Sequence, residues 1–263
     1  METPANLRDD AFAGTAEAYL RFRPPYPRAL LGDLVTRAAP AAGGTLVDLA
    51  CGPGRIALDL AGAFGTVLAI DLEPQMVAVG QREAARRAIG NVTWRVGRAE
   101  EAQIAPGSVD LITIGEAFHR LDQTAITAKA LAWLKPGGCL ATMGMGGPLA
   151  GGEAWKAIVG SVARTWMPAG WAQGAAGAEI GPGASGRVLR RAGFAVFESP
   201  DFEAAHDWSF DEVVGYLHST SVCSLRALGE GAAAFEAALR AALGEGPFHE
   251  AQTAGYTLGR KPR

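Results

Sequence analysis

Residues 46–61 read LVDLACGPGRIALDLA and place two glycines, Gly52 and Gly54, between an apolar run and an amphipathic one. The apolar run is too continuous for a strand with one solvated face, so we expect it inside a sheet that is covered on both sides. The amphipathic run after Gly54 has helical spacing. A buried strand, a glycine turn and a helix in this order are typical of a doubly wound parallel sheet.

Short apolar runs and amphipathic runs keep alternating from residue 44 to about 145 and resume after 183. This alternation predicts an α/β fold, with one doubly wound, mostly parallel, seven-stranded sheet and a helical cap. We expect strands near 45–50, 66–71, 92–96, 109–114, 138–143, 194–204 and 249–259, and helices near 54–63, 74–88, 123–133, 184–192, 209–219 and 230–243.

Four segments are expected along the chain. N-terminal capping helices occupy 1–43, and a cofactor-binding core occupies 44–145. Residues 146–182 are rich in glycine and tryptophan and show almost no regular period, so we expect a mobile lid there. Residues 183–263 complete the sheet and carry inserted cap helices.

The composition excludes several classes of protein. Of 263 residues, 49% are hydrophobic and 19% are charged, which excludes a disordered chain. With 24 basic and 27 acidic residues the net charge is −3, so we expect a small-molecule substrate and neither a nucleic acid nor a membrane as partner. Cys51, Cys139 and Cys223 have no metal-ligand spacing, which predicts a reduced cytoplasmic protein without a metal. We expect a monomer or a homodimer.

Asp71 ends the apolar run TVLAID, nineteen residues after Gly52. At this spacing a carboxylate can accept both hydroxyls of a ribose, while the glycines let backbone N–H groups approach a ligand closely. A tight turn followed by an ordinary exposed aspartate would explain either feature alone. Together they predict a nucleotide-like ligand, either a nicotinamide or flavin dinucleotide or S-adenosylmethionine.

Asp48 favours S-adenosylmethionine over a dinucleotide. Gly52, Gly54 and Ala57 satisfy the dinucleotide fingerprint G-x-G-x-x-A. However, a carboxylate at Asp48 would repel a pyrophosphate, whereas it can orient the loop and face the ammonium group of S-adenosylmethionine. The chain also has no tyrosine followed four residues later by lysine, a pair that serves hydride transfer. The methyl donor is therefore the favoured ligand.

The core holds, in order, DLACGPG at 48–54, AIDLEPQMV at 69–77, VGRAEE at 96–101, SVDLITIGEAFHRLD at 108–122 and LKPGG at 134–138. These five motifs resemble those of class I S-adenosylmethionine-dependent methyltransferases, which share a Rossmann-like fold. Two further stretches resemble a small-molecule subgroup that includes trans-aconitate methyltransferase-like and natural-product tailoring enzymes. They are AEAYLRFRPPYP at 16–27 and HDWSFDEVVGYLHSTS at 206–221.

The resemblance implies a donor site on the residues that match these motifs. Backbone groups of Ala50, Gly52 and Gly54 would hold the methionine end of S-adenosylmethionine, and Asp71 would accept the ribose hydroxyls. The residues implied around the adenine are Leu72, Met76, Ala99 and Glu100.

Tyr19 and Arg23 precede the core, in a segment dense with aromatic residues and proline. Arg23 can clamp the carboxylate of the donor in a charge-assisted pair. Tyr19 can close over the sulfonium, because an aromatic face attracts a cation. The alternative is that these side chains only pin an N-terminal helix to the sheet.

His119 and Glu116 follow the fourth expected strand, where the acceptor should meet the methyl group of the donor. Methyl transfer from a sulfonium is an in-line displacement that chiefly needs positioning in a site closed to water, without a metal. A hydroxyl acceptor also needs a general base. We therefore predict a methyltransferase for a small organic acceptor, with O-methylation foremost, N- or C-methylation open, and His119 and Glu116 as catalytic candidates.

Two other functions stay open at this point. An NAD(P)-dependent oxidoreductase is disfavoured by Asp48 and by the missing tyrosine–lysine pair. A protein of methyltransferase fold can also use the bound donor without transferring its methyl group. Only the products of the reaction separate that case from a true methyltransferase.

Overall fold

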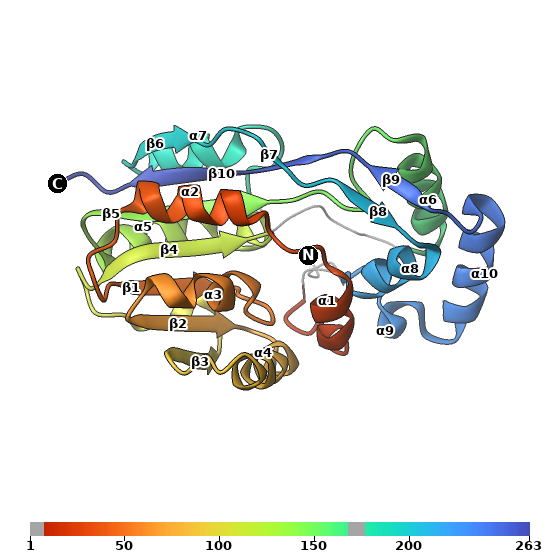
Figure 1. Cartoon of the computed structure of the whole chain (residues 1–263), viewed down its shortest axis with the longest axis horizontal. Coiled ribbons are helices and arrows are strands. Elements are labelled where there is room, and N and C mark those ends of the chain that lie inside the picture. The colour runs from red at the N-terminus through yellow and green to blue at the C-terminus, as the bar shows by residue number, and fades with distance from the viewer. Residues whose placement is uncertain (1–7, 168–176) are drawn as a thin grey trace. The chain divides into compact units, whose positions relative to one another are not determined.

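The computed structural model describes residues 8–167 and 177–263, which divide into two compact units (Figure 1). The sheet unit contains, among the described residues, 26–144, 177–202 and 254–263. The helical unit contains 8–25, 145–167 and 203–253. Residues 26–43, which the sequence assigned to an N-terminal cap, thus pack with the sheet unit. The four segments themselves stay a prediction.

The sheet unit is built on a sheet with the strand order β3-β2-β1-β4-β5-β10-β6. Strands β1 to β5 pair in parallel, and β10 runs antiparallel between β5 and β6. The predicted doubly wound, mostly parallel α/β sheet is confirmed. The strands are β1 (Thr45–Leu49), β2 (Thr66–Asp71), β3 (Val92–Val96), β4 (Val109–Gly115), β5 (Leu134–Gly144), β6 (Ala195–Glu198) and β10 (Thr253–Arg260), with the short β7 (Phe202–Glu203) beside β10.

Helices cover both faces of this sheet. α2 (Arg28–Ala38) and α3 (Arg55–Leu60) lie on one face, and α5 (Gln123–Trp133) and α7 (Ala184–Arg191) on the other (Figure 1). α4 (Pro74–Arg86) packs against β2 and β3. The continuous apolar runs of the strands follow from this arrangement, because a strand covered on both faces has no solvated side.

The strand order reverses direction between β1 and β4, which are neighbours in the sheet. The chain leaves β1 toward β2 and β3 on one side, and leaves β4 toward β5 on the other. In open α/β sheets the ligand lies at such a switch point, outside the carboxyl ends of the strands. The fold therefore places the glycine loop after β1 and the residues after β4 at one edge.

Trp94 on β3 lies in a space left by two glycines. A Cβ atom on Gly54 would overlap the Trp94 ring, lying 3.0 Å from its Cζ3 atom. A Cβ atom on Gly80 of α4 would also overlap this ring and would lie 3.1 Å from the backbone oxygen of Pro53. The absence of both side chains lets one indole fill the corner between the glycine loop and α4.

Gly80→Ala is expected to lower the free energy of unfolding by about 1–3 kcal/mol, because the added methyl group overpacks the Trp94 corner. An alanine in a helix is otherwise favoured over glycine by about 1 kcal/mol. The control is Gly32→Ala in α2, where a Cβ atom would meet nothing within 4 Å. Urea unfolding should show Gly32→Ala equal to or more stable than the parent, and a stabilised Gly80→Ala chain would contradict the packing argument.

The helical unit has its own core, in which Trp208, Phe235 and Val159 are fully buried. At its centre the Lys156 ammonium pairs with the carboxylate of Glu250, and the Trp208 indole donates to the same carboxylate at 2.7 Å. The elements of the unit are α1 (Ala16–Phe22), α6 (Ala154–Trp166), α8 (Phe210–His218), α9 (Leu225–Leu228) and α10 (Ala232–Leu243), with the antiparallel pair β8 (His206–Trp208) and β9 (Phe248–Glu250).

Three expectations for secondary structure are wrong. The expected strand over 194–204 is divided into β6, which ends at Glu198, and the short β7, since Pro200 between them cannot donate to a sheet ladder. The expected strand over 249–259 is divided between β9, which pairs with β8, and β10, which pairs with β5. The segment 146–182, which we expected to be irregular, contains the regular helix α6. Residues 168–176 of this segment, including Trp171, lie outside the described residues.

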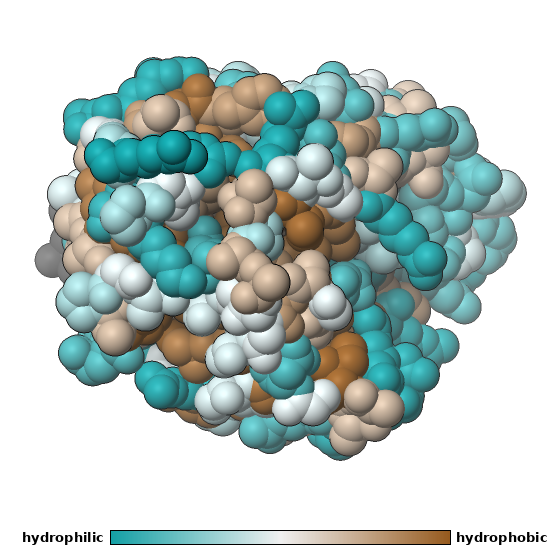
Figure 2. All heavy atoms as spheres, turned by 60° about the vertical axis from the view of Figure 1, so that its left-hand side comes forward, coloured by the Kyte–Doolittle hydropathy of each residue, from teal (hydrophilic) through white to brown (hydrophobic). Residues whose placement is uncertain are grey.

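The described surface carries few large exposed hydrophobic side chains, namely Val96, Ile158, Ile180 and Leu225. Figure 2 shows hydrophilic and hydrophobic residues interspersed over the visible face. No helix within 8–167 or 177–263 is long and apolar enough to cross a membrane. The same residues hold no cluster of three or more His, Cys, Asp or Glu side chains that could bind a metal ion.

Candidate functional site

The glycine loop connects β1 to α3 through three residues with left-handed backbone conformation. Ala50 has φ 51°, Gly52 has φ 55° and Gly54 has φ 77°. Glycine adopts this conformation freely, whereas an L-residue such as Ala50 does so at a cost of about 1–2 kcal/mol. Such strain is retained where the backbone must present its polar groups in a set direction.

Asp71 ties this loop to the end of β2. Its Oδ2 atom accepts the Gly52 N–H at 2.7 Å, and its Oδ1 atom accepts the Glu73 N–H at 2.9 Å. Burial raises the pKa of the Asp71 carboxyl, and the two backbone hydrogen bonds oppose that shift. Each carboxylate oxygen has two lone pairs, so the group can accept further hydrogen bonds while it holds the loop.

Asp48 lies inside the sheet beneath the same loop, with no exposed surface. Its Oδ1 atom accepts the Thr113 hydroxyl at 2.7 Å, and its Oδ2 atom accepts the Ala57 N–H in the first turn of α3 at 3.1 Å. Burial raises the pKa of Asp48 to about 7. The carboxyl thus joins β1, β4 and α3, as its expected role in orienting the loop requires. That it also faces a ligand stays a prediction.

The residues expected around an adenine follow the carboxyl ends of β2 and β3. Met76 on α4 and Ala99 are buried, at 2% and 5% exposure, while Leu72 is half-buried. Glu100 is half-buried too, and its Oε1 atom accepts the Asp122 N–H at 3.1 Å, next to the start of α5. The structure places all four in the sheet unit, and their contacts with an adenine stay a prediction.

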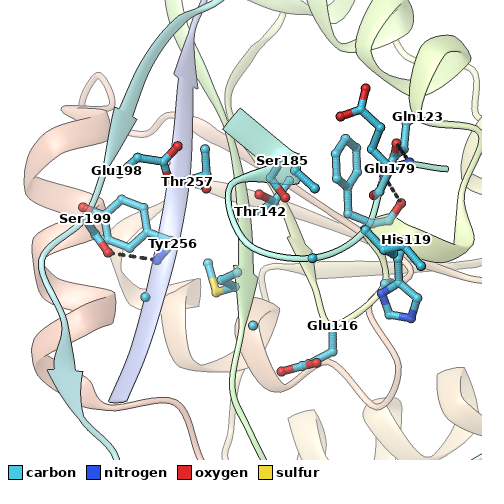
Figure 3. Close-up of a pocket in the computed structure, with 18 of the residues that line it drawn as sticks. Glu116, His119, Gln123, Thr142, Glu179, Ser185, Glu198, Ser199, Tyr256 and Thr257 are labelled. Carbon is cyan, nitrogen blue, oxygen red and sulfur yellow. Dashed lines mark hydrogen bonds between the residues drawn. The ribbon is translucent and has the colours of Figure 1, made fainter. Parts of the chain in front are cut away.

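Glu116 and His119 follow β4, and both line one cavity (Figure 3). Glu116 has a left-handed backbone with φ 55°, and its N–H donates to the Met143 carbonyl at 2.9 Å. Burial, with a smaller contribution from the charge of Arg120, lowers the pKa of the His119 imidazole below 6.5. At neutral pH the imidazole is therefore uncharged and able to accept a proton.

The cavity has a volume of about 400 Å³ and lies at the carboxyl ends of β4 and β5 (Figure 3). Beyond the residues after β4, its walls come from β5, from the end of β6, from β10 and from the start of α7. Sequence reasoning missed these other walls, whose polar side chains include Thr142, Ser185, Glu198, Ser199 and Thr257. Thr142 alone carried a local signal, since it is a polar residue within an apolar run.

Tyr19 and Arg23 belong to the helical unit and lie close to each other there. The Arg23 guanidinium stacks on the Tyr19 ring at 4.5 Å and on the Tyr216 ring at 4.3 Å. It donates to Ser219 Oγ at 2.8 Å and to the Tyr216 hydroxyl at 3.2 Å. Sequence reasoning missed these two partners. The expected contacts of Tyr19 and Arg23 with a donor stay a prediction.

A family model described as a methyltransferase domain matches residues 46–138. The chain carries a methyltransferase domain. The match covers the strand order β3-β2-β1-β4, the glycine loop and Asp71, and it confirms the resemblance to class I methyltransferases that the sequence motifs indicated.

Known proteins resemble this methyltransferase domain and its surroundings. The chain is 38% identical to a ubiquinone/menaquinone biosynthesis C-methyltransferase from Rubrivivax gelatinosus over 105 residues, which cover 40% of each protein. It is 34% identical to nocamycin O-methyltransferase from Saccharothrix syringae over 145 residues, 53% of this chain and 49% of that protein. The chain thus spans half or less of the length of these curated relatives.

A solved structure extends the likeness beyond the methyltransferase domain. A candidate type II methyltransferase from Anaeromyxobacter dehalogenans aligns with a TM-score of 0.57 at 27% identity. The alignment covers 91% of this chain and 96% of that one. The fold is therefore shared over nearly the whole length of both chains.

Proposed function

We propose that this chain is an S-adenosylmethionine-dependent methyltransferase that methylates a small organic acceptor, with O-methylation foremost and N- or C-methylation open. One observation carries the proposal. At the switch point of a doubly wound sheet, Asp71 at the end of β2 accepts the Gly52 N–H of a glycine loop that opens α3. The names of the two curated relatives, an O-methyltransferase and a C-methyltransferase, support the reaction class.

The residues at this edge fit the donor. The loop backbone at Ala50, Gly52 and Gly54 would bind its methionine end, because ligands of doubly wound folds lie at the glycine turn after the first strand. Asp71 has acceptor capacity left for the ribose hydroxyls. The assignments that complete the site in the sheet unit are Leu72, Met76, Ala99 and Glu100 at the adenine and Asp48 beneath the loop. From the sequence alone, Tyr19 and Arg23 of the helical unit are assigned to the sulfonium and the carboxylate.

The donor supplies a methyl group activated by a sulfonium when it is bound. What this chain must add is alignment of the acceptor with that methyl group and exclusion of water. For a hydroxyl acceptor, His119 takes the proton of the hydroxyl on its neutral ring as the new bond forms. Glu116, which lines the same cavity, is the second candidate for this proton transfer.

Asp71→Ala is expected to weaken binding of S-adenosylmethionine by about 2 kcal/mol or more, which is about 30-fold in Kd, because a buried charged hydrogen-bond acceptor is lost. Calorimetry measures this, with thermal unfolding as a check that the loop still folds. Asp211→Ala, at an aspartate that is 90% exposed on α8, is the control and should bind as the parent does. Equal affinity in parent and Asp71→Ala would show that the ribose lies elsewhere.

The same calorimetry separates the alternative functions. An oxidoreductase would bind NADP more tightly than S-adenosylmethionine, and no heat from S-adenosylmethionine would contradict a methyltransferase. A protein that uses the donor without methyl transfer would bind it and yet release no S-adenosylhomocysteine. A true methyltransferase releases S-adenosylhomocysteine in step with a methylated product, which mass spectrometry detects.

Other expectations from the sequence remain part of this proposal. They are a cytoplasmic location, a role in natural-product biosynthesis, a monomeric or homodimeric state, and a substrate that is not a nucleic acid. The net charge of −3 supports the last of these, since nucleic-acid binding relies on basic side chains. The three cysteines are unpaired and buried, which suits a reducing compartment.

A further inference from the structure

Thr142 carries a buried hydroxyl that the fold does not use. It lies on β5 with 5% of its surface exposed, and it lines the cavity of about 400 Å³ (Figure 3). Its Oγ1 atom has no hydrogen-bond partner among residues 8–167 and 177–263. Buried polar side chains are nearly always satisfied, and an unsatisfied one is destabilising. A ligand group that enters this cavity can supply the missing hydrogen bond.

The charged residues that line this cavity are all acidic. Glu116, Glu179, Glu198 and Asp201 line it, whereas no lysine or arginine is found among its described lining residues. Arginines of α7 pair with two of these carboxylates but do not line the cavity: two pair with Glu179, and one lies 3.7 Å from Glu198. A ligand with a carboxylate or a phosphate would therefore enter without a basic partner.

Two helices begin at this cavity, and a helix N-terminus by itself attracts anions. At both N-termini a carboxylate of the chain lies close to the first turn of the helix. In the first turn of α5 the Asp122 carboxylate accepts the Ala125 N–H at 2.9 Å. In the first turn of α7 a Cβ atom on Gly186 would overlap Oε1 of Glu198, so that carboxylate lies directly against the helix. A carboxylate of the chain thus lies near each N-terminus, and its negative charge disfavours an anionic ligand there.

Further hydroxyl groups extend the polar lining. The Thr257 hydroxyl donates to Oε2 of Glu198 at 2.6 Å, and the Ser199 hydroxyl donates to the Pro200 carbonyl at 2.9 Å. Ser185 lines the same cavity from α7. The wall is thus hydrogen-bonding and negatively charged, and His119 at neutral pH adds no positive charge to it.

We propose that this cavity is the acceptor site, that an uncharged or positively charged hydrogen-bonding group of the acceptor pairs with Thr142, and that acceptors bearing a carboxylate or a phosphate are excluded. This inference rests on the proposed function, because it places the acceptor beside His119 and Glu116 at the end of β4. It goes further by setting the charge class of the acceptor and by naming Thr142 as a specificity residue.

Three small phenols test the charge class. Tyrosol, tyramine and 4-hydroxyphenylacetate share the phenol and differ at the other end, which is neutral, cationic or anionic. Their binding to the full chain, saturated with S-adenosylhomocysteine, is measured by calorimetry. Tyrosol and tyramine are expected to bind at least about tenfold more tightly than 4-hydroxyphenylacetate. Equal or tighter binding of 4-hydroxyphenylacetate, or no binding of tyrosol and tyramine, overturns the proposal.

Thr142→Val tests the hydroxyl, because valine keeps the shape of threonine. We expect the variant to bind tyrosol about tenfold more weakly, while its unfolding midpoint stays the same or rises. Thr127→Val is the matched control, since Thr127 is also buried and its hydroxyl donates to the Gln123 carbonyl at 2.7 Å. The control should unfold more easily and bind tyrosol as the parent does. Unchanged tyrosol binding by Thr142→Val overturns the role of Thr142.

Binding of S-adenosylhomocysteine, measured first, keeps the two proposals apart. If the chain binds S-adenosylhomocysteine but binds neither tyrosol nor tyramine, the acceptor inference is wrong and the proposed function stands. If the chain does not bind it, the proposed function fails and this inference fails with it.

Discussion

His119→Gln is expected to lower kcat by about 10²–10⁴-fold with an acceptor that reacts through a hydroxyl, because glutamine cannot take up the proton. The size of the effect follows from the state of the ring. Burial and the neighbouring Arg120 charge lower the pKa of His119 below 6.5, so the parent holds a neutral base throughout the neutral range. S-adenosylhomocysteine release under saturating donor and acceptor measures kcat.

The pH profile distinguishes a base from a residue that only shapes the site. Because the neutral imidazole is the active form, kcat of the parent should fall as the pH drops through the lowered pKa, on the acid side of 6.5. In the His119→Gln chain this fall of kcat at acid pH should be absent. His249→Gln is the control, since His249 is exposed and its ring bonds to Asp207 at 2.7 Å in the helical unit. A His119→Gln chain with the parent profile would contradict the base role.

Asp48→Asn is expected to remove a pH dependence of stability worth about 4 kcal/mol. The pKa of Asp48 is about 7 in the folded chain, because burial disfavours the carboxylate, against 3.8 for the ordinary group. The unfolded chain therefore releases this proton first as the pH rises. The stabilising contribution is complete below about pH 4 and is lost progressively up to about pH 7.

An asparagine at this position can keep both internal contacts, since its oxygen accepts from the Ala57 N–H and its amide donates to Thr113. Urea unfolding at several pH values should show that the free energy of unfolding of Asp48→Asn, relative to that of the parent, rises by about 4 kcal/mol between pH 4 and pH 8. Asp110→Asn is the control, because the pH dependence of stability that it removes has the opposite sign. Burial raises the pKa of Asp110, but hydrogen bonds from Lys135 and from the Thr45 and Ala41 N–H groups outweigh it and hold the pKa low. A parallel pH dependence in Asp48→Asn and the parent would contradict the assignment.

The sheet and the donor edge were predictable because their signals are local. One buried strand, Gly52, Gly54 and Asp71 lie within 27 residues, and together they place the switch point before any long-range contact is known. Helix α6 was missed although its pattern is local too. Trp155, Val159, Ala163 and Trp166 recur at helical spacing, but the glycines that precede them obscured the period.

The acceptor cavity was not predictable, because its walls meet only in the folded sheet. Thr142 on β5 and Glu198 on β6 are separated by 56 positions, and β10 from the end of the chain lies between their strands. Arg23 and Ser219 are 196 positions apart and still form a hydrogen bond. No spacing rule connects such residues, since the fold alone determines which strand ends are neighbours.

Trp94 gives the chain an internal optical reporter. Its indole lies against Gly54 of the glycine loop and against Gly80, so the surroundings of the ring change whenever the loop moves. Indole fluorescence depends on the packing and polarity around the ring. Binding at the loop can therefore be followed in real time without an attached dye, with a Trp94→Phe chain as the blank.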